Sequence, residues 1–296
     1  MPDNPSGILY LVATPIGNLD DLSARATATL RTVDVIAAED TRHSRALFIR
    51  YGVATPVVSL HEHNEDRASS RLLARLLSGE SVAVVSDAGT PLLSDPGLPL
   101  VRAARAQGIR VVPVPGPCAI IAALSASGLA VDRFTFEGFP PRFSGQRRHH
   151  FETLRNDRRT LIFYESSHRI RETVRDMVEV FGPTRRLVIA RELTKVHETI
   201  VSTMLGEAGT VLEEPNMIKG EFVLLLEGAP APDVTGELTA DQERILKLLL
   251  EECSVKTASS LGARMYGVSR DAFYRRALEI RRQADWARCR GDDPIG

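Results

Sequence analysis

Three loops rich in proline and glycine carry side chains suited to holding a small polar ligand. They span residues 14–18, 86–97 and 113–118, and each follows a short apolar run. The middle loop, Ser-Asp-Ala-Gly-Thr-Pro-Leu-Leu-Ser-Asp-Pro-Gly, is the richest, because Asp87 and Asp95 can accept hydrogen bonds from ribose hydroxyls or an ammonium group. One such loop is more often a plain strand-to-helix turn with aspartate as a helix cap. Three together favour a ligand site at strand ends.

A basic segment over residues 141–159 is the second candidate for binding chemistry. It holds six arginines and two histidines against Glu152 and Asp157. Clustered positive charge can neutralise phosphates, and Phe143 can stack on a base. A solvated helix face explains the segment equally well, because only four of the 37 basic residues are lysines and the whole chain is biased toward arginine. Residues 40–45 form a smaller basic spot after another apolar run.

Several familiar sites are excluded by missing motifs. The chain has no G-x-G-x-x-G, no P-loop and no H-E-x-x-H, and its three cysteines are far apart, so we expect no bound metal. His61 and His63 could bind a metal, but such histidines more often make polar contacts. With no apolar run of about 20 residues, no secretory signal and no disulfide framework, we expect a cytoplasmic protein without membrane attachment.

The apolar runs before these loops indicate the elements that must position them. Unalternating, β-branched runs are typical of parallel strands covered on both faces. Helices closed by glycine at 79 and 108 lie between them. The predicted strands span 8–13, 33–38, 57–60, 82–85 and 111–114, and the predicted helices 65–77 and 99–107. This alternation predicts an open, mostly parallel sheet in a first lobe over residues 7–115.

The pattern restarts after residues 115–117, Pro-Gly-Pro, and predicts a second α/β lobe over 116–228 with a mixed sheet. Its predicted strands span 133–136, 160–164, 187–190, 199–202 and 221–226, with helices at 119–127 and 169–181. A stiff Ala-Pro-Ala-Pro linker follows. Helices predicted at 239–250, 256–265 and 270–282 have the outline of a helix-turn-helix, which gives a small helical domain over 236–290.

The loop motifs also resemble a known family. Residues 13–19, 38–42, 86–97, 115–117 and 163–166 are similar to the tetrapyrrole-methylase superfamily. Residues 138–142, 191–195 and 219–221 resemble one branch of it, which methylates a cytidine ribose of 16S rRNA at the 2′-oxygen in the decoding region. The resemblance runs from about Gly7 to Glu227 and includes the helical tail.

This resemblance implies a two-lobed tetrapyrrole-methylase-like fold, usually a homodimer, with S-adenosyl-L-methionine as methyl donor in the cleft between the lobes. Its substrate would be 16S rRNA in the small ribosomal subunit, so that the protein would serve rRNA processing. By motif, the implied cofactor-binding residues are Pro15, Asp87, Ala88, Gly89, Thr90, Ser94, Asp95, Cys118, Ala119, Tyr164, Ala190, Lys219, Gly220 and Glu221. Cys118 replaces the usual serine and Ser167 the usual proline, which puts a side-chain contact at 118 in doubt.

Methyl transfer to a ribose hydroxyl needs alignment and a nearby base or cation. Glu192, Lys195 and Glu165 are the candidates, although an ion pair that supports a loop is an equally good interpretation of each. Candidate RNA contacts are Arg42, Arg142, Arg147, Arg148 and Arg155. Two alternatives stay open: a precorrin C-methyltransferase on the same fold, and a nucleic-acid binder that uses only the helical tail.

Overall fold

The computed structural model describes residues 7–214, 217–230 and 238–290, and of residues 284–290 only the backbone. The chain divides into two compact units, residues 1–229 and 230–296. Two separate five-stranded sheets lie within the first unit. The three-part division at residues 115 and 228 stays a prediction.

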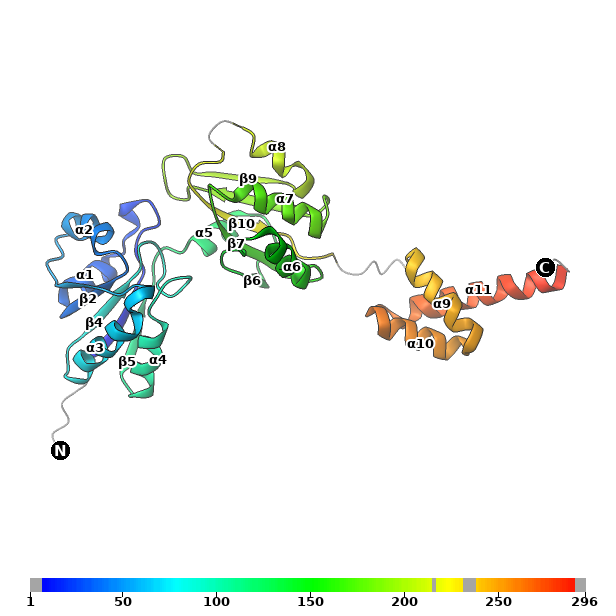
Figure 1. The fold of residues 1–296 in the computed structure, drawn as a ribbon, viewed down its shortest axis with the longest axis horizontal. Coiled ribbons are helices and arrows are strands. Elements are labelled where there is room, and N and C mark those ends of the chain that lie inside the picture. The colour runs from blue at the N-terminus through cyan, green and yellow to red at the C-terminus, as the bar shows by residue number, and fades with distance from the viewer. Residues whose placement is uncertain (1–6, 215–216, 231–237, 291–296) are drawn as a thin grey trace. The chain divides into compact units, whose positions relative to one another are not determined.

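The first sheet is parallel throughout and has the order β3-β2-β4-β1-β5. Its strands are β1 (Ile8–Val12), β2 (Val35–Ala38), β3 (Val57–Ser59), β4 (Val82–Val85) and β5 (Arg110–Val114). Every residue of the inner strands β2 and β4 is buried, as continuous apolar runs predict for a sheet covered on both faces. Helices α1 (Ala24–Thr32) and α2 (Thr41–Arg50) pack on one face, and α3 (Glu65–Leu77) and α4 (Leu98–Ala106) on the other (Figure 1).

This strand order places a switch point between β1 and β4. The two strands are neighbours, but the helices that follow them, α1 and α4, lie on opposite faces of the sheet. In open α/β sheets, ligands bind outside the carboxyl ends of the strands at such a point. The loops over 14–18 and 86–97 leave β1 and β4 there.

The second sheet is mixed and has the order β6-β7-β10-β8-β9. Only β6 (Phe134–Phe136) and β7 (Thr160–Ser166) run parallel, while β8 (Arg186–Arg191), β9 (Thr199–Met204) and β10 (Glu221–Leu226) pair antiparallel. Helices α6 (Ser144–Leu154), α7 (Ile170–Phe181) and the short α8 (Ala208–Val211) cover one face, and α5 (Ala119–Ala126) covers the other.

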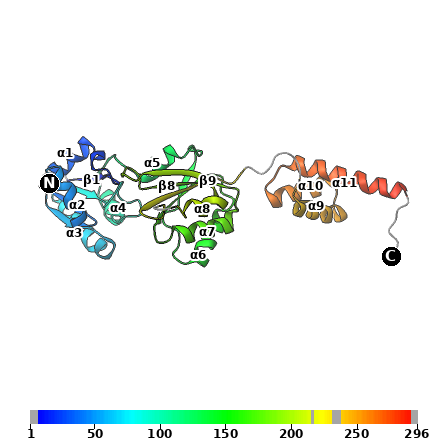
Figure 2. The same cartoon turned by 90° about the horizontal axis from the view of Figure 1, so that it is seen from above.

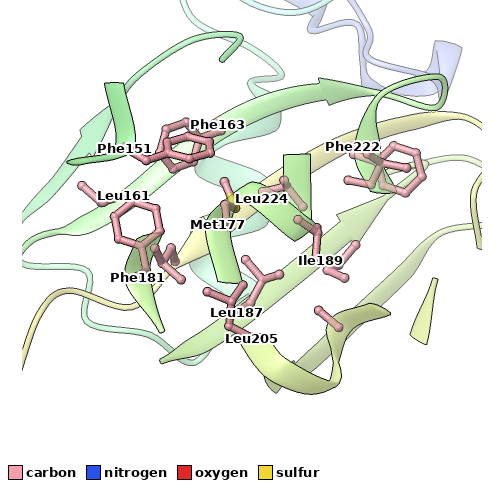
Figure 3. Close-up of a cluster of buried hydrophobic side chains, with 14 of the residues drawn as sticks. Phe151, Leu161, Phe163, Met177, Phe181, Leu187, Ile189, Leu205, Phe222 and Leu224 are labelled. Carbon is pink, nitrogen blue, oxygen red and sulfur yellow. The ribbon is translucent and has the colours of Figure 1, made fainter. Parts of the chain in front are cut away.

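Alternate residues of the second sheet supply two separate cores. Phe163 packs toward α6 and α7, while its neighbour Ile162 packs toward α5. Figure 3 shows the first core, where Phe151 meets Phe163 edge to face with ring centroids 5.5 Å apart. The ring centroid of Phe181 lies 5.4 Å from that of Phe151. This aromatic core fixes α6 and α7 on the sheet.

The second unit is a three-helix domain made of α9 (Ala240–Glu252), α10 (Val255–Tyr266) and α11 (Arg270–Arg290) (Figure 2). Thr239 and Gln242 form the predicted capping box. A Cβ at Gly262 would lie 2.3 Å from the Phe273 ring, so glycine lets α10 and α11 approach closely. The helix-turn-helix outline and the α/β fold class are confirmed.

Four helices of the first unit differ from the prediction, which has none at α1, α2, α6 or the four-residue α8. Helix α1 is rich in alanine and threonine and buries only Ala26 and Leu30, so it lacks a wide apolar stripe. Helix α2 begins at a clear cap, since the Asp40 carboxylate accepts from the N–H of Arg42 at 2.8 Å. Helix α6 lies in the basic segment, whose sequence is equally compatible with phosphate binding and with a solvated helix face.

Candidate active site

The three predicted loops are tied together by direct hydrogen bonds. Thr14 and Gly89 exchange backbone N–H to C=O bonds of 2.9 and 3.1 Å. Thr90 Oγ1 donates to the carbonyl of Pro117 at 3.2 Å. Gly89 has a φ of +81°, and a Cβ there would lie 3.2 Å from a methyl of Ile16. Glycine thus permits both the left-handed turn and the close approach of the loops.

A loop of the second lobe docks on this assembly. The N–H of Asn18 donates to Thr194 Oγ1 at 3.1 Å, and a Cβ at Gly17 would lie 2.4 Å from Cγ of Lys195. On the other side of the same loop, a Cβ at Gly220 would lie 2.4 Å from Oε1 of Glu192. The two lobes therefore meet where residues 192–195 fit between two glycines.

A cavity of about 540 Å³ lies within this arrangement. Among its walls are these predicted cofactor-binding residues: Asp87, Ala88, Gly89, Thr90, Ser94, Asp95, Ala119, Tyr164, Ala190, Gly220 and Glu221. Three predicted residues lie elsewhere: Pro15 lines an adjoining hollow, Cys118 is the residue before α5, and Lys219 is exposed. The size of the cavity is typical of a cofactor pocket.

Sequence reasoning missed other wall residues, among them Glu39, Leu93, Phe139, Ser167 and Leu193. Glu39 could have been found, because it follows β2 at the same sheet edge as Asp87. Phe139 lies in the branch motif over residues 138–142, which is a signal for it. It reaches the wall because its ring packs 5.5 Å from that of Tyr164.

Three carboxylates at the carboxyl edge of the first sheet give the cavity a negative character. Burial, with a contribution from the charge of Asp87, raises the pKa of Asp95 to about 6. Burial and the charges of Asp95 and Asp87 likewise raise the pKa of Glu39. Like charges this close disfavour joint ionisation, so a cationic ligand would be stabilised here. A sulfonium or ammonium group fits this set of acceptors.

The second lobe supplies an apolar wall opposite the carboxylates. Tyr164 packs edge to face against Phe136 with ring centroids 4.8 Å apart, and burial raises the pKa of its hydroxyl. Leu93 and Leu193 extend this wall. Apolar and aromatic surface beside a few polar groups suits a ligand with a planar ring system and a charged end.

The left-handed backbone conformation concentrates at this site. Among the described residues other than glycine, only Leu92, Ser94, Glu192 and Thr194 have positive φ, between 50° and 75°. All four belong to the two loops that meet at the cavity, one from each lobe. Such conformations cost of the order of 1 kcal/mol or more each and persist where surrounding contacts impose them, commonly at functional sites.

Two of the three catalytic candidates form an ion-pair network at the rim. Lys195 Nζ lies 2.9 Å from Glu192 Oε1 and 3.0 Å from Glu221 Oε2. Burial opposes ionisation of both residues. It is outweighed at Glu192 by bonds from Lys195 and the Glu221 N–H, which lower its pKa. At Lys195 the two carboxylates raise the pKa. Lys195 is thus held as a cation and Glu192 as an anion.

The third candidate, Glu165, is held by internal contacts. It borders the cavity, but its side chain is fully buried, and its carboxylate accepts from Thr173 Oγ1 at 2.5 Å and the N–H of Ser166 at 2.8 Å. Arg169 lies 3.5 Å away. These internal donors contact both oxygens and favour a structural role that anchors β7 to α7, and the catalytic role of Glu165 stays a prediction.

An adjoining hollow of about 490 Å³ shares Ile16, Asp87, Ala88 and Glu221 with the cavity. Its other walls are Thr14, Pro15, Gly17, Leu19, Arg42, His43, Ser44, Ala46, Leu47, Ser86 and Lys195. Apolar side chains thus lie beside two cations, an imidazole and the two carboxylates, Asp87 and Glu221, that the hollow shares with the cavity. Lys195 is paired with carboxylates, whereas the Arg42 side chain has no hydrogen-bond or ion-pair partner among the described residues and can meet an anionic group.

The predicted RNA-contact arginines have different environments. Arg42 lines the hollow, while Arg142 and Arg155 are exposed. Arg148 pairs with Glu179 at 2.6 Å. Arg147 is 1 % exposed. It pairs with Asp176 at 2.6 Å and donates to the carbonyls of residues 141 and 142, so its prediction as an RNA contact is wrong.

No group of three or more potential metal ligands occurs among the described residues. His61 and His63 contact each other edge to face, with ring centroids 5.9 Å apart. In the part of the chain that the structure describes, no helix is long and apolar enough to span a bilayer.

Comparison with known proteins assigns the family. A family model described as Tetrapyrrole (Corrin/Porphyrin) Methylases matches residues 8–209, and one described as the RsmI C-terminal HTH domain matches residues 236–281. A Pseudomonas aeruginosa protein named Ribosomal RNA small subunit methyltransferase I is 52% identical over 275 residues, 93% of this chain and 98% of that protein. Its namesake from Escherichia coli O157:H7 is 50% identical over 278 residues, 94% and 96% of the two chains.

Solved structures share the fold of the two lobes. The methyltransferase CobJ has a TM-score of 0.57 at 20% identity, over 77% of this chain and 97% of its own. A uroporphyrin-III C-methyl transferase from Thermus thermophilus, complexed with S-adenyl homocysteine, has a TM-score of 0.52 at 18% identity, over 74% and 97%. With half of all residues shared with the curated relatives over nearly their full length, the chain belongs to the ribosomal RNA small subunit methyltransferase I family of the tetrapyrrole methylases.

Proposed function

We propose that this protein transfers a methyl group from S-adenosyl-L-methionine to the 2′-oxygen of a cytidine ribose in the decoding region of 16S rRNA. Its relatives are named as methyltransferases of small-subunit rRNA. The observation that carries the proposal is the pair of joined cavities. One is acidic and suited to a cationic donor. The other places Arg42, whose side chain has no hydrogen-bond or ion-pair partner among the described residues, beside apolar surface and is suited to a nucleotide.

The donor would occupy the larger cavity. Asp87, Asp95 and Glu39 would face its positive groups, and Tyr164 and Phe139 its flat ring system. When bound, S-adenosylmethionine supplies an electrophilic methyl carbon on a sulfonium. The chain's contribution is to hold that group beside the shared wall at Ile16 and Ala88, where the two cavities adjoin.

The acceptor nucleotide would occupy the adjoining hollow. Arg42 would meet a phosphate, and Ala46 and Leu47 offer apolar surface to a ribose or base. Alignment of a hydroxyl with the methyl carbon supplies much of the acceleration in such a displacement. The common wall of the two cavities would set that alignment.

The charge states in the rim network indicate its role. Lys195 is held protonated and Glu192 ionised, so neither is poised to remove the hydroxyl proton. Lys195 instead suits the stabilisation of negative charge that develops on the ribose oxygen, and Glu192 and Glu221 position it. His43 carries an imidazole in the same hollow and is our candidate for the proton acceptor.

The test uses 30S subunits from cells that lack this protein. We expect the purified protein and S-adenosylmethionine to add one methyl group to a cytidine ribose, located by mass mapping of 16S rRNA fragments. Methylation of a base, or of no residue in 16S rRNA, would contradict the proposal. A parallel reaction with a precorrin tests the alternative activity. The names of the solved structures CobJ, at 20% identity, and uroporphyrin-III-C-methyltransferase, at 21%, favour that alternative.

Three further points stay predictions: the homodimer, the cytoplasmic location and a role of the second unit in gripping RNA. The last can be tested by deleting residues 235–296. We expect weaker 30S binding with unchanged cofactor affinity, and unchanged 30S binding would exclude the role.

A further inference from the structure

Helix α3 carries a row of arginines that the reaction itself does not use. Arg67, Arg71 and Arg75 recur every four residues, so they share one face of the helix at intervals of about 6 Å. All three line a hollow of about 450 Å³ between α3 and β3. β3 is an edge strand of the first sheet, so this hollow lies at the margin of the lobe. We call these three residues the α3 stripe.

The charge of the α3 stripe is largely uncompensated. Arg75 pairs with Glu80 at 2.5 Å, but neither Arg67 nor Arg71 has a hydrogen-bond or ion-pair partner among the described residues, and both are exposed. Asp66 is adjacent to Arg67 in sequence and so projects from a different part of the helix. A row of free guanidinium groups over a hollow is a surface that attracts anions.

The spacing and lining favour a repeating anion over a single one. Guanidinium groups repeated along an axis match a phosphodiester backbone, where one phosphate follows another, and each can bind a phosphate through two N–H groups. The floor of the hollow is apolar, with Val58, Ala68 and Leu72. Apolar surface below and cations above suit a sugar-phosphate chain better than an isolated inorganic ion.

The α3 stripe also leads toward the proposed active site. β3 ends at Ser59, and α3 begins a few residues later, so Arg67 lies near the carboxyl edge of the sheet. That edge carries Glu39 and Asp87, which line the donor cavity. Arg75 lies toward the opposite edge, where its partner Glu80 precedes β4. An RNA strand lying on the stripe would therefore have one end close to the reaction.

We propose that the α3 stripe is an RNA-backbone contact surface, which holds phosphates of the rRNA at a distance from the target nucleotide. The identity of this RNA rests on the proposed function. An acidic segment of a ribosomal protein is the competing occupant, and the experiment separates it.

The test compares two double variants that remove the same charge. R67Q/R71Q neutralises the free part of the stripe. R105Q/R110Q neutralises Arg105 of α4 and Arg110, the first residue of the opposite edge strand β5. Both are exposed, and neither side chain has a hydrogen-bond or ion-pair partner in the part of the chain that the structure describes. The probes are undermethylated 30S subunits and a protein-free 16S rRNA fragment that contains the decoding region. Dissociation constants are measured over a series of KCl concentrations, with thermal unfolding and cofactor affinity as controls.

We expect R67Q/R71Q to bind both probes about tenfold more weakly, and the slope of log Kd against log salt to fall by about 0.7 to 0.9 for each lost phosphate contact. Cofactor affinity, thermal stability and kcat at saturating 30S should be unchanged. R105Q/R110Q should bind like the unmodified protein.

Three results would overturn the α3 stripe as an RNA surface. They are binding by R67Q/R71Q equal to that of the unmodified protein, an equal loss in R105Q/R110Q, and a loss on 30S subunits but not on free rRNA, which would identify a protein partner. The proposed function fails separately, if the unmodified protein methylates no cytidine ribose in 30S subunits. That outcome leaves the comparison of RNA affinities intact.

Discussion

The two lobes bring charge to the active site in opposite ways. The first lobe contributes Asp87, Asp95 and Glu39, none of which has an ion-pair partner among the described residues. The second contributes Lys195 and Glu192, which neutralise each other at 2.9 Å. The unpaired acids of the first lobe need a counter-charge from a ligand. The Lys195–Glu192 pair already has its counter-charge within the protein.

The same contrast separates the two basic helices. In α6, the segment most basic in sequence, Arg147 and Arg148 both have carboxylate partners. In α3, Arg67 and Arg71 have none among the described residues. The density of positive charge in the sequence is therefore a poorer guide to an RNA surface than the pairing of that charge in the fold.

The largest expected effect comes from breaking a compensated pair in the core. Arg147→Met leaves Asp176 buried with only Ser144 Oγ as a hydrogen-bond donor, at 2.9 Å. Loss of one partner of a buried pair costs about 3–5 kcal/mol, so we expect a large fall in the free energy of unfolding, measured by urea titration. The double variant R147M/D176L should recover most of it. A small loss in the single variant would mean that the pair is not buried in solution.

The next effect concerns the compensated pair at the rim. Lys195→Ala should lower kcat about 10² to 10³-fold in 30S methylation, because charge on the ribose oxygen would lose its cation. Cofactor affinity, measured by calorimetry, should change little, and Lys195→Arg should restore part of the rate. Arg186→Ala, an exposed cation at the opposite end of β8, is the matched control. An unchanged rate in Lys195→Ala would remove it from the mechanism.

A smaller, pH-dependent effect is expected from the uncompensated acids. Burial raises the pKa of Asp95 from 3.8 to about 6. The folded protein thus holds this proton more tightly than the unfolded chain, and ionisation destabilises the fold progressively as the pH rises through that interval. Asp95→Asn should raise the Tm of the cofactor-free protein by about 2–4 °C near neutral pH, and by little near pH 4.

The same variant should weaken cofactor binding about tenfold near neutral pH, since a carboxylate that faces a cation is lost. Differential scanning calorimetry and isothermal titration across this pH range measure both effects. A variant that is less stable near neutral pH would show that Asp95 is already compensated in the free protein.

The smallest effect is expected from Arg148→Gln. Its guanidinium is paired with Glu179, so its removal should change affinity for the 16S rRNA fragment less than about twofold, as is common for exposed ion pairs. A loss as large as that of R67Q/R71Q would show that pairing does not distinguish the two helices.

The first lobe was largely predictable because its β-branched runs and terminal glycines are local signals. Helices α1 and α2 were missed because few apolar residues recur at helical spacing within them. The position of Arg147 could not be predicted, since its partner Asp176 lies 29 residues away on another helix. The α3 stripe was visible as a spacing, but its hollow and missing partners are properties of the folded chain.

The residues of the cavity walls also divide into those that local motifs predict and those that depend on packing between distant segments. Loop residues such as Asp87 and Asp95 were identified from motifs that lie at strand ends. Phe139 lies in the branch motif over residues 138–142, but its place in the cavity wall depends on packing against Tyr164. Contacts within a loop join residues that are close in sequence, so a motif can predict them. Contacts between loops depend on the register of distant strands.

The glycines at 17 and 220 have a mechanical consequence. Residues 192–195 fit between them with no room for even one methyl group on either side. Gly17 belongs to the first lobe and Lys195 to the second, so a side chain at 17 would act as a wedge. The spacing of the two lobes at this point, and with it the distance from donor to acceptor, therefore depends on the absence of a Cβ at residue 17.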